Sequence, residues 1–193
     1  MPSLQPGVIV LCGGTSRRMG EHDKTSESLA GTTVMDHLLD ALPSSWEVVC
    51  VGEERATTRS VRWCRESPAG GGPVAGIAAG LDELDRLGAL IAVVVGGDMP
   101  FAASALPTLV DALNAQPRID AVLATDPGGR RQPLLAAYRC GVLRAALPRE
   151  PAGARLMHVV DSLVTETVPR EAQVTLDVDT PEALERARHI VGT

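Results

Sequence analysis

The strongest strand pattern in the chain is Leu90–Val95, which reads LIAVVV and runs directly into Gly96-Gly97-Asp98. An apolar run rich in β-branched residues is typical of a strand that is buried on both faces. A strand of this kind belongs in the middle of a parallel sheet, with helices packed against both sides. The stretch therefore predicts an α/β fold.

Strand and helix patterns alternate along the rest of the chain, which predicts a doubly wound, mostly parallel, Rossmann-like sheet. The length suits one domain spanning residues 1–193. Further strands are expected at residues 8–11, 48–51, 61–64, 121–124, 164–168 and 175–179, with a turn entering another strand over residues 127–139. Helices are expected at residues 33–42, 77–87, 104–115, 142–147 and 154–160, and from Thr180 onward.

Four unusual stretches each directly follow a predicted strand. They are LCGGTSRRMG at 11–20, RESPAGGG at 65–72, GGDMPF at 96–101 and LDVDTP at 176–181. In an open parallel sheet the carboxyl ends of the strands meet at one edge, and ligands bind in the crevice beyond that edge. We therefore expect all four stretches to lie together.

The first of these stretches has the composition of a phosphate cradle. Gly13 to Ser16 allow a tight turn with exposed backbone N–H groups, and Arg17, Arg18 and Lys24 add positive charge. Of the 18 basic residues, Lys24 is the single lysine. A compact ammonium on a flexible stem follows a reacting phosphate in a way that a planar guanidinium does not. Lys24 is therefore the first candidate catalytic residue.

The loop matches neither of two familiar phosphate-binding motifs. Asp23 stands before Lys24-Thr25, where a Walker P-loop requires glycine, and the spacing from Gly13 to Gly20 does not fit GxGxxG. The loop resembles instead the signature L-x-G-G-x-S-x-R-M-G-x-(x)-D-K of nucleotidyltransferases, specifically the molybdenum cofactor guanylyltransferases. The matching residues are Leu11, Gly13, Gly14, Ser16, Arg18, Met19, Gly20, Asp23 and Lys24.

The resemblance implies that this loop binds the triphosphate and base of GTP. It assigns nucleotide binding to Leu11, Cys12, Gly13, Gly14 and Lys24. It also assigns catalytic roles to Lys24 and Arg18. A solvated glycine-rich surface turn is the alternative interpretation.

Asp98 follows the apolar strand directly and precedes Met99-Pro100. A carboxylate buried at such a position requires a partner. In nucleotide chemistry, Mg²⁺ is usually held by one or two carboxylates together with phosphate oxygens. GDMPF also resembles the family's metal-binding segment, which implies that Asp98 holds the Mg²⁺ that bridges the nucleotide phosphates. An aspartate that only caps the following helix is the alternative.

The stretch around Glu66 resembles the family's segment beside the guanine site. GGPVAG, residues 71–76, is similar to the family's GPLAG, and its glycines allow close approach of the backbone. Most relatives carry aspartate near the start of this loop, so the resemblance implies that Glu66 contacts the nucleoside, with Gly72 beside it. A flexible turn before a helix is the alternative.

Asp177 and Asp179 stand in DVDTPE, where the family more often shows NVNTPE. The asparagines of the family are associated with the pterin substrate, whereas aspartates would offer further oxygen ligands to the metal. Asp179 is thus a second candidate metal ligand, and both residues are candidates for the acceptor site. Asp179 or Thr180 as a helix cap is the alternative.

Arginines in the last third are candidates for an acceptor phosphate site, because a guanidinium binds phosphate with two parallel hydrogen bonds. Arg155 in AGARL resembles the family's G-x-R segment. The remaining candidates are Arg130, Arg131 and Arg139. For any one of them, a solvated surface arginine is the alternative.

Composition excludes several other classes of protein. The net charge of −6 and the scarcity of aromatic residues disfavour a nucleic-acid-binding surface. No stretch is long and apolar enough to span a bilayer, so no membrane is expected. The four cysteines are scattered without a CxxC pair, which indicates a reduced, cytoplasmic protein without a zinc site.

The resemblance implies that GTP and molybdenum-bearing molybdopterin react to give the guanine dinucleotide cofactor and pyrophosphate, with Mg²⁺ as cofactor. A cytidylyltransferase for the same pterin and another small-molecule enzyme such as a phospholactate guanylyltransferase are alternatives with the same chemistry. A non-catalytic GTP-binding subunit is an alternative of a different class. Lys24 together with Asp98 argues against it, because binding alone does not require that pair.

Overall fold

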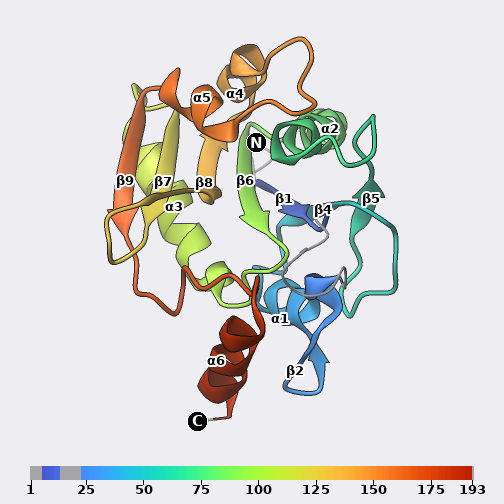
Figure 1. Ribbon diagram of the computed structural model, residues 1–193. Helices are drawn as coiled ribbons and strands as arrows, with labels where there is room; N and C mark the ends of the chain where they lie inside the picture. The colour runs from blue at the N-terminus through green and yellow to red at the C-terminus, as the bar shows by residue number, and fades with distance from the viewer. Residues whose placement is uncertain (1–5, 14–22, 193) are drawn as a thin grey trace.

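The computed structural model describes residues 6–13 and 23–192 and is built on a seven-stranded sheet (Figure 1). The strand order is β5-β4-β1-β6-β8-β7-β9. The strands are β1 (Gly7–Leu11), β4 (Glu47–Val51), β5 (Arg62–Cys64), β6 (Ile91–Gly96), β7 (Ala121–Thr125), β8 (Arg131–Arg139) and β9 (Thr165–Pro169). All neighbouring strands are parallel except β8, which is antiparallel to both β6 and β7. The predicted mostly parallel α/β fold is confirmed.

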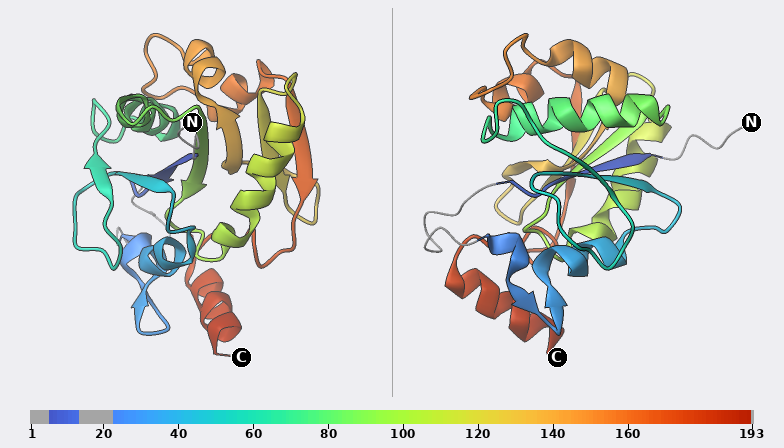
Figure 2. Two further views of the ribbon diagram at one scale, coloured as in Figure 1. Left: turned by 180° about the vertical axis from the view of Figure 1, so that it is seen from behind. Right: turned by 90° about the vertical axis from the view of Figure 1, so that its right-hand side faces the viewer.

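Helices cover both faces of this sheet, as the two views of Figure 2 show. Helices α2 (Pro73–Arg86), α4 (Cys140–Ala146) and α5 (Leu156–Asp161) pack on one face. Helices α1 (Val34–Ala41) and α3 (Leu106–Ala115) pack on the other, together with the short 3₁₀ helix η3 (Ala102–Ala105). Along β1, Val8 and Val10 lie in the core on the side of α1 and α3, and Ile9 lies in the core on the side of α2. Burial on both faces is what the continuous apolar strands predicted.

Helix α2 begins four residues earlier than the helical periodicity predicts. Gly72 precedes it with a φ of 85°, a backbone conformation that glycine adopts without strain, and Pro73 occupies the first helical position. The glycine-rich stretch at residues 65–72 therefore leads directly into α2. The other predicted helices form within a few residues of their expected positions.

The C-terminal helix α6 (Pro181–Val191) begins at Thr180, whose side chain accepts a hydrogen bond of 3.2 Å from the N–H of Ala183. It packs against the hairpin β2 (Ser28–Leu29) and β3 (Thr32–Thr33), so the two elements lie side by side at the lower end of Figure 1. The strand predicted at residues 175–179 is wrong, because this segment runs to α6 without joining the sheet. Among the described residues, no helix is long and apolar enough to cross a membrane.

A close contact between α2 and β1 gives a test of this packing. A Cβ placed on Gly80 would lie 2.6 Å from Cγ2 of Ile9, inside the sealed core. We expect Gly80→Ala to lower the free energy of unfolding by about 1–3 kcal/mol in urea denaturation, since overpacking forces the core to shift. Gly141→Ala in α4 is the matched control, because nothing lies within 4 Å of the added methyl group. An equal loss in both variants would contradict the packing described here.

Candidate active site

The carboxyl ends of β1 and β6 lie side by side at the edge where a doubly wound sheet binds its ligands. Leu11 is paired with Gly96 in the parallel register, and the N–H of Gly97 donates a hydrogen bond of 2.9 Å to the carbonyl of Leu11. A Cβ on Gly97 would lie 3.2 Å from that same carbonyl oxygen. A small residue at this position thus lets the end of β1 and the Asp98 segment meet.

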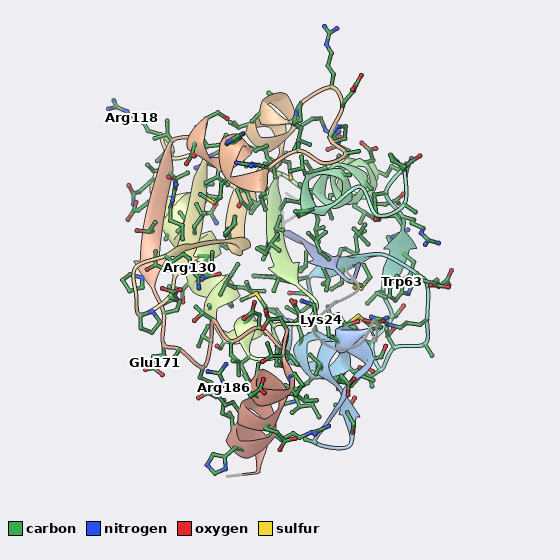
Figure 3. All side chains as sticks on the ribbon, viewed as in Figure 1. Lys24, Trp63, Arg118, Arg130, Glu171 and Arg186 are labelled. Carbon is green, nitrogen blue, oxygen red and sulfur yellow. The ribbon has the colours of Figure 1, made fainter. Side chains whose placement is uncertain are left out.

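Lys24 and Asp98 form an ion pair at this edge. Lys24 lies beneath the end of β6 in Figure 3. Their side chains are about four-fifths buried, with 19% and 17% of their surfaces exposed. Lys24 opens the 3₁₀ helix η2 (Lys24–Ser26), and the buried Thr25 packs its methyl group toward Gly97. The structure therefore brings together the only lysine and the aspartate that follows the central strand.

Asp23 holds η2 in place as its N-terminal cap. Its Oδ1 accepts hydrogen bonds from the N–H of Thr25 at 3.0 Å and from the Thr25 hydroxyl at 2.6 Å, and its Oδ2 accepts one from Ser26 at 3.0 Å. Partial burial opposes ionisation, but the bonds from Thr25 and the positive charge of Arg55 outweigh it and lower the pKa of Asp23. The carboxylate thus stays charged beside Lys24.

The DVDTPE segment is attached to the other side of Asp98. The N–H of Val178 donates a hydrogen bond of 2.8 Å to the backbone carbonyl of Asp98. The concave surroundings of Asp177 remove part of its hydration, and the charges of Asp179 and Asp98 add to this, so its pKa is raised. Lys24 acts in the opposite direction. Three carboxylates and one ammonium therefore share the carboxyl edge of β6.

Glu66 lies beside Gly13 at the carboxyl edge of the sheet, and its contact with the nucleoside stays a prediction. Its Oε1 accepts a hydrogen bond of 2.9 Å from the N–H of Gly70 and lies 3.9 Å from the position that a Cβ on Gly13 would take. Gly72 closes this segment at the start of α2. Two of the glycine-rich stretches are thus neighbours.

The thiol of Cys12 does not face this site. It packs in the core with its Sγ 3.3 Å from the Sδ of Met35, and hydrogen bonding with Cys50 together with burial raises its pKa well above the ordinary value. Its N–H is bonded to the carbonyl of Val51 at 2.9 Å. Leu11 likewise buries its side chain against the core formed with α2. Neither side chain is placed to read a base. Gly14 and Arg18 lie outside the described residues.

A cavity of about 640 Å³ lies at the end of β7 and the start of β8. Its lining includes Arg130, Arg131 and Asp177, so it joins two of the predicted arginines to the acidic segment. Asp126 shapes one wall, because its Oδ1 accepts hydrogen bonds of 2.9 Å from the N–H groups of Gly128 and Arg130. Sequence reasoning missed Asp126, although an aspartate before Pro-Gly-Gly is a turn signal.

The other two predicted arginines have different outcomes. Arg155 is exposed directly before α5. Two residues earlier, the N–H of Gly153 donates a hydrogen bond of 2.8 Å to the carbonyl of Gly71, in the stretch at residues 65–72 that contains Glu66. Arg139 is wrong as an acceptor residue. It pairs with Ile91 at the start of β6, the opposite end of the sheet, and donates to carbonyls that end α3, including Leu113 at 2.9 Å.

A sheet of this strand order, with Lys24 paired to Asp98 and further carboxylates at its carboxyl edge, is the arrangement of an α/β nucleotidyltransferase. The chain belongs to the MobA-like NTP transferase domain family, whose sequence pattern matches residues 8–167. It is 29% identical to a probable molybdenum cofactor guanylyltransferase of Natronomonas pharaonis, with 93% of this chain and 95% of the relative covered. It is 30% identical to a molybdenum cofactor guanylyltransferase of Rhodopseudomonas palustris, covering 74% and 71% respectively.

Solved structures show the same fold. Molybdopterin-guanine dinucleotide biosynthesis protein A from Archaeoglobus fulgidus superimposes with a TM-score of 0.74 at 24% identity, covering 96% of this chain and 98% of that one. A 2-C-methyl-D-erythritol 4-phosphate cytidylyltransferase from Thermus thermophilus gives a TM-score of 0.70 at 17% identity, covering 98% and 100%. Since one fold serves different nucleotides and acceptors, the choice of substrate depends on the site residues.

Two aspartates of the same cavity, Asp177 and Asp126, should affect the free energy of unfolding in opposite directions as the pH changes. Because the pKa of Asp177 is raised in the folded state, its ionised form destabilises the fold at neutral pH. We expect Asp177→Asn to increase the free energy of unfolding at pH 7, with the gain disappearing as the pH falls to the ordinary aspartate value of 3.8. Denaturant unfolding at several pH values measures this.

Asp126→Asn is the matched control for that measurement. The backbone N–H of Arg130 is the main cause that lowers the pKa of Asp126, so its ionised form stabilises the fold. The variant should lose stability at neutral pH, and the loss should shrink as the pH falls. A gain for Asp126→Asn or a loss for Asp177→Asn at neutral pH contradicts the charge arrangement.

Proposed function

We propose that this protein is a molybdenum cofactor guanylyltransferase, which transfers GMP from GTP to the phosphate of molybdenum-bearing molybdopterin and releases pyrophosphate. The observation that carries the proposal is the Lys24–Asp98 pair at the neighbouring carboxyl ends of β1 and β6. Glu66 beside Gly13 supports a nucleoside site next to that pair. The names of the two relatives support guanine and the pterin as substrates.

The residues at the edge suit a magnesium ion. Within the described part of the chain, no three acidic, histidine or cysteine side chains form a complete metal cage. Mg²⁺ in nucleotide sites is commonly held by only one or two carboxylates plus phosphate oxygens. Asp98 would hold it, and Asp179, two residues from Asp177 in the same charge cluster, is the second candidate ligand. When bound, the ion would neutralise charge on the phosphates of GTP.

The chain's own residues position the reactants and compensate charge. The acceptor phosphate attacks the α-phosphorus of GTP in line, and the bond to the β-phosphate oxygen breaks to release pyrophosphate. Lys24 carries the positive charge that stabilises the phosphates during this exchange. No protein nucleophile or general base is required, because the acceptor phosphate is already ionised near neutral pH. Catalysis therefore depends on geometry and electrostatics.

The cavity between β8 and the DVDTPE segment is the proposed acceptor site. Arg130 and Arg131 on its wall, with Arg155 directly before the neighbouring α5, supply donors for the pterin phosphate. Asp177 offers a carboxylate to the polar edge of the pterin in the position where the family more often has asparagine. All four cysteines are free thiols, which suits the cytoplasmic location that we propose.

The experiment that tests the proposal is a comparison of nucleotides. With Mg²⁺ present, GTP should give the largest thermal stabilisation, since a ligand at 100 times its Kd adds about 2.7 kcal/mol. Incubation with GTP and molybdenum-bearing molybdopterin should then release pyrophosphate. Asp98→Asn should reduce that release on the order of 10²-fold or more while the fold stays intact. Preference for CTP would instead identify a cytidylyltransferase, and GTP binding without pyrophosphate release would identify a non-catalytic subunit.

A further inference from the structure

Arg55 links the loop after β4 to the segment that carries Lys24. It lies in the connection between β4 and β5, outside every stretch that the family resemblance identified. One guanidinium nitrogen, Nη1, forms an ion pair with Oδ2 of Asp23. The other, Nη2, donates to the hydroxyl of Thr25. Arg55 thus binds the side chains of both residues that flank Lys24 in the sequence.

The guanidinium is itself held on its remaining sides. Its Nη2 lies 3.2 Å from the Sδ of Met35 on α1, and its Cζ lies 5.9 Å from the ring centroid of Trp63 on β5. Figure 3 shows Trp63 on the side of Lys24 that faces the β5 edge of the sheet. A cation above an aromatic face is attracted to it, and three-quarters of the Arg55 side chain is shielded from solvent. Arg55 is therefore a fixed anchor.

The anchor acts on Lys24 through Asp23 and Thr25. Asp23 caps η2, whose first residue is Lys24, and Thr25 packs toward Gly97, the residue before Asp98. Arg55 completes the set of bonds on Asp23 by occupying Oδ2 together with the Ser26 hydroxyl. Any displacement of this cap would move the Cα of Lys24, and with it the side chain, relative to Asp98.

We propose that Arg55 is a positioning residue for Lys24, which fixes η2 so that the ammonium stays on the phosphates as their charge changes. A planar fork that binds an aspartate and a hydroxyl at once is needed for this, and lysine does not supply one. The expected role in turnover rests on the proposed function, whereas the effect on the position of Lys24 does not depend on it.

The single lysine gives a direct test. Reductive ¹³C-methylation labels Lys24 and the N-terminal amine alone, so the Lys24 signal is assigned by comparison with Lys24→Arg. Asp98→Asn shows how far the signal moves when the ion pair is lost. We expect Arg55→Gln and Arg55→Lys to move the Lys24 signal as well. The matched control is Arg59→Gln in the same connection, because Arg59 donates to carbonyls after α1, including Leu42 at 3.0 Å.

Kinetics of the same variants provide the second readout. In Arg55→Gln we expect kcat to fall about 10–100-fold, because small displacements at a reacting centre have effects of this size. The KM for GTP should change less than about threefold, since the lost contact matters mainly in the transition state. Arg55→Lys should not restore kcat, and Arg59→Gln should lower the unfolding temperature with kcat near the wild-type value.

The outcomes separate the two proposals. A Lys24 signal at its wild-type position in Arg55→Gln overturns the positioning role, whatever the activity. A Lys24 signal that moves in Arg55→Gln but not in Arg59→Gln supports the positioning role. If the wild-type protein itself does not transfer GMP, the proposed function fails, and the role of Arg55 still stands.

Discussion

The parallel pairing of β1 with β6 is the constraint on which the site depends. It sets Leu11 beside Gly96, and the hydrogen bond from Gly97 to the Leu11 carbonyl continues that register past the ends of both strands. The chain leaves β1 at Leu11 and β6 at Gly96, so Gly13 and Asp98 lie at one edge although they are 85 residues apart in sequence. Because both faces of the two strands are buried, slippage of the register would expose or misplace an entire core, so the apolar packing fixes the chemistry.

The second constraint is electrostatic. The chain is acidic overall, yet its proposed substrates are anions, so positive charge must be supplied locally. Asp98, the first candidate metal ligand, pairs with Lys24, which is the only ammonium side chain of the protein. Burial, followed by repulsion from Asp179 and Asp98, raises the pKa of Asp177. Such crowding costs stability and is typical of sites built for function.

The fold could be predicted from the sequence because its strands are apolar on both faces and its helices have clear starts and stops. The segment at residues 175–179 was predicted as a strand and is wrong, since the alternation of apolar Leu176 and Val178 reflects packing against α6 and the β2–β3 hairpin. Arg139 shows the same limit for side chains. A sequence does not reveal that its guanidinium is used by the carbonyls at the end of α3.

For the site, prediction succeeded where residues form local motifs. Asp98, Lys24, Glu66 and Asp177 all lie at the expected edge, and their roles there stay predictions. The contribution of Arg55 could not be predicted, because it comes from a connection of irregular sequence and acts on a segment that is remote along the chain. Its partners become visible only when β4 and β5 place the connection beside η2.

The measurement that tests the central claim most directly is the turnover of Lys24→Arg. The substitution keeps the positive charge and replaces the compact ammonium by a planar fork. If Lys24 follows the phosphates during transfer, kcat should fall on the order of 10²-fold, nearly as far as in Lys24→Ala, with GTP binding weakened less and circular dichroism unchanged. Wild-type kcat in Lys24→Arg would contradict the account, because any positively charged side chain at this position would then be sufficient.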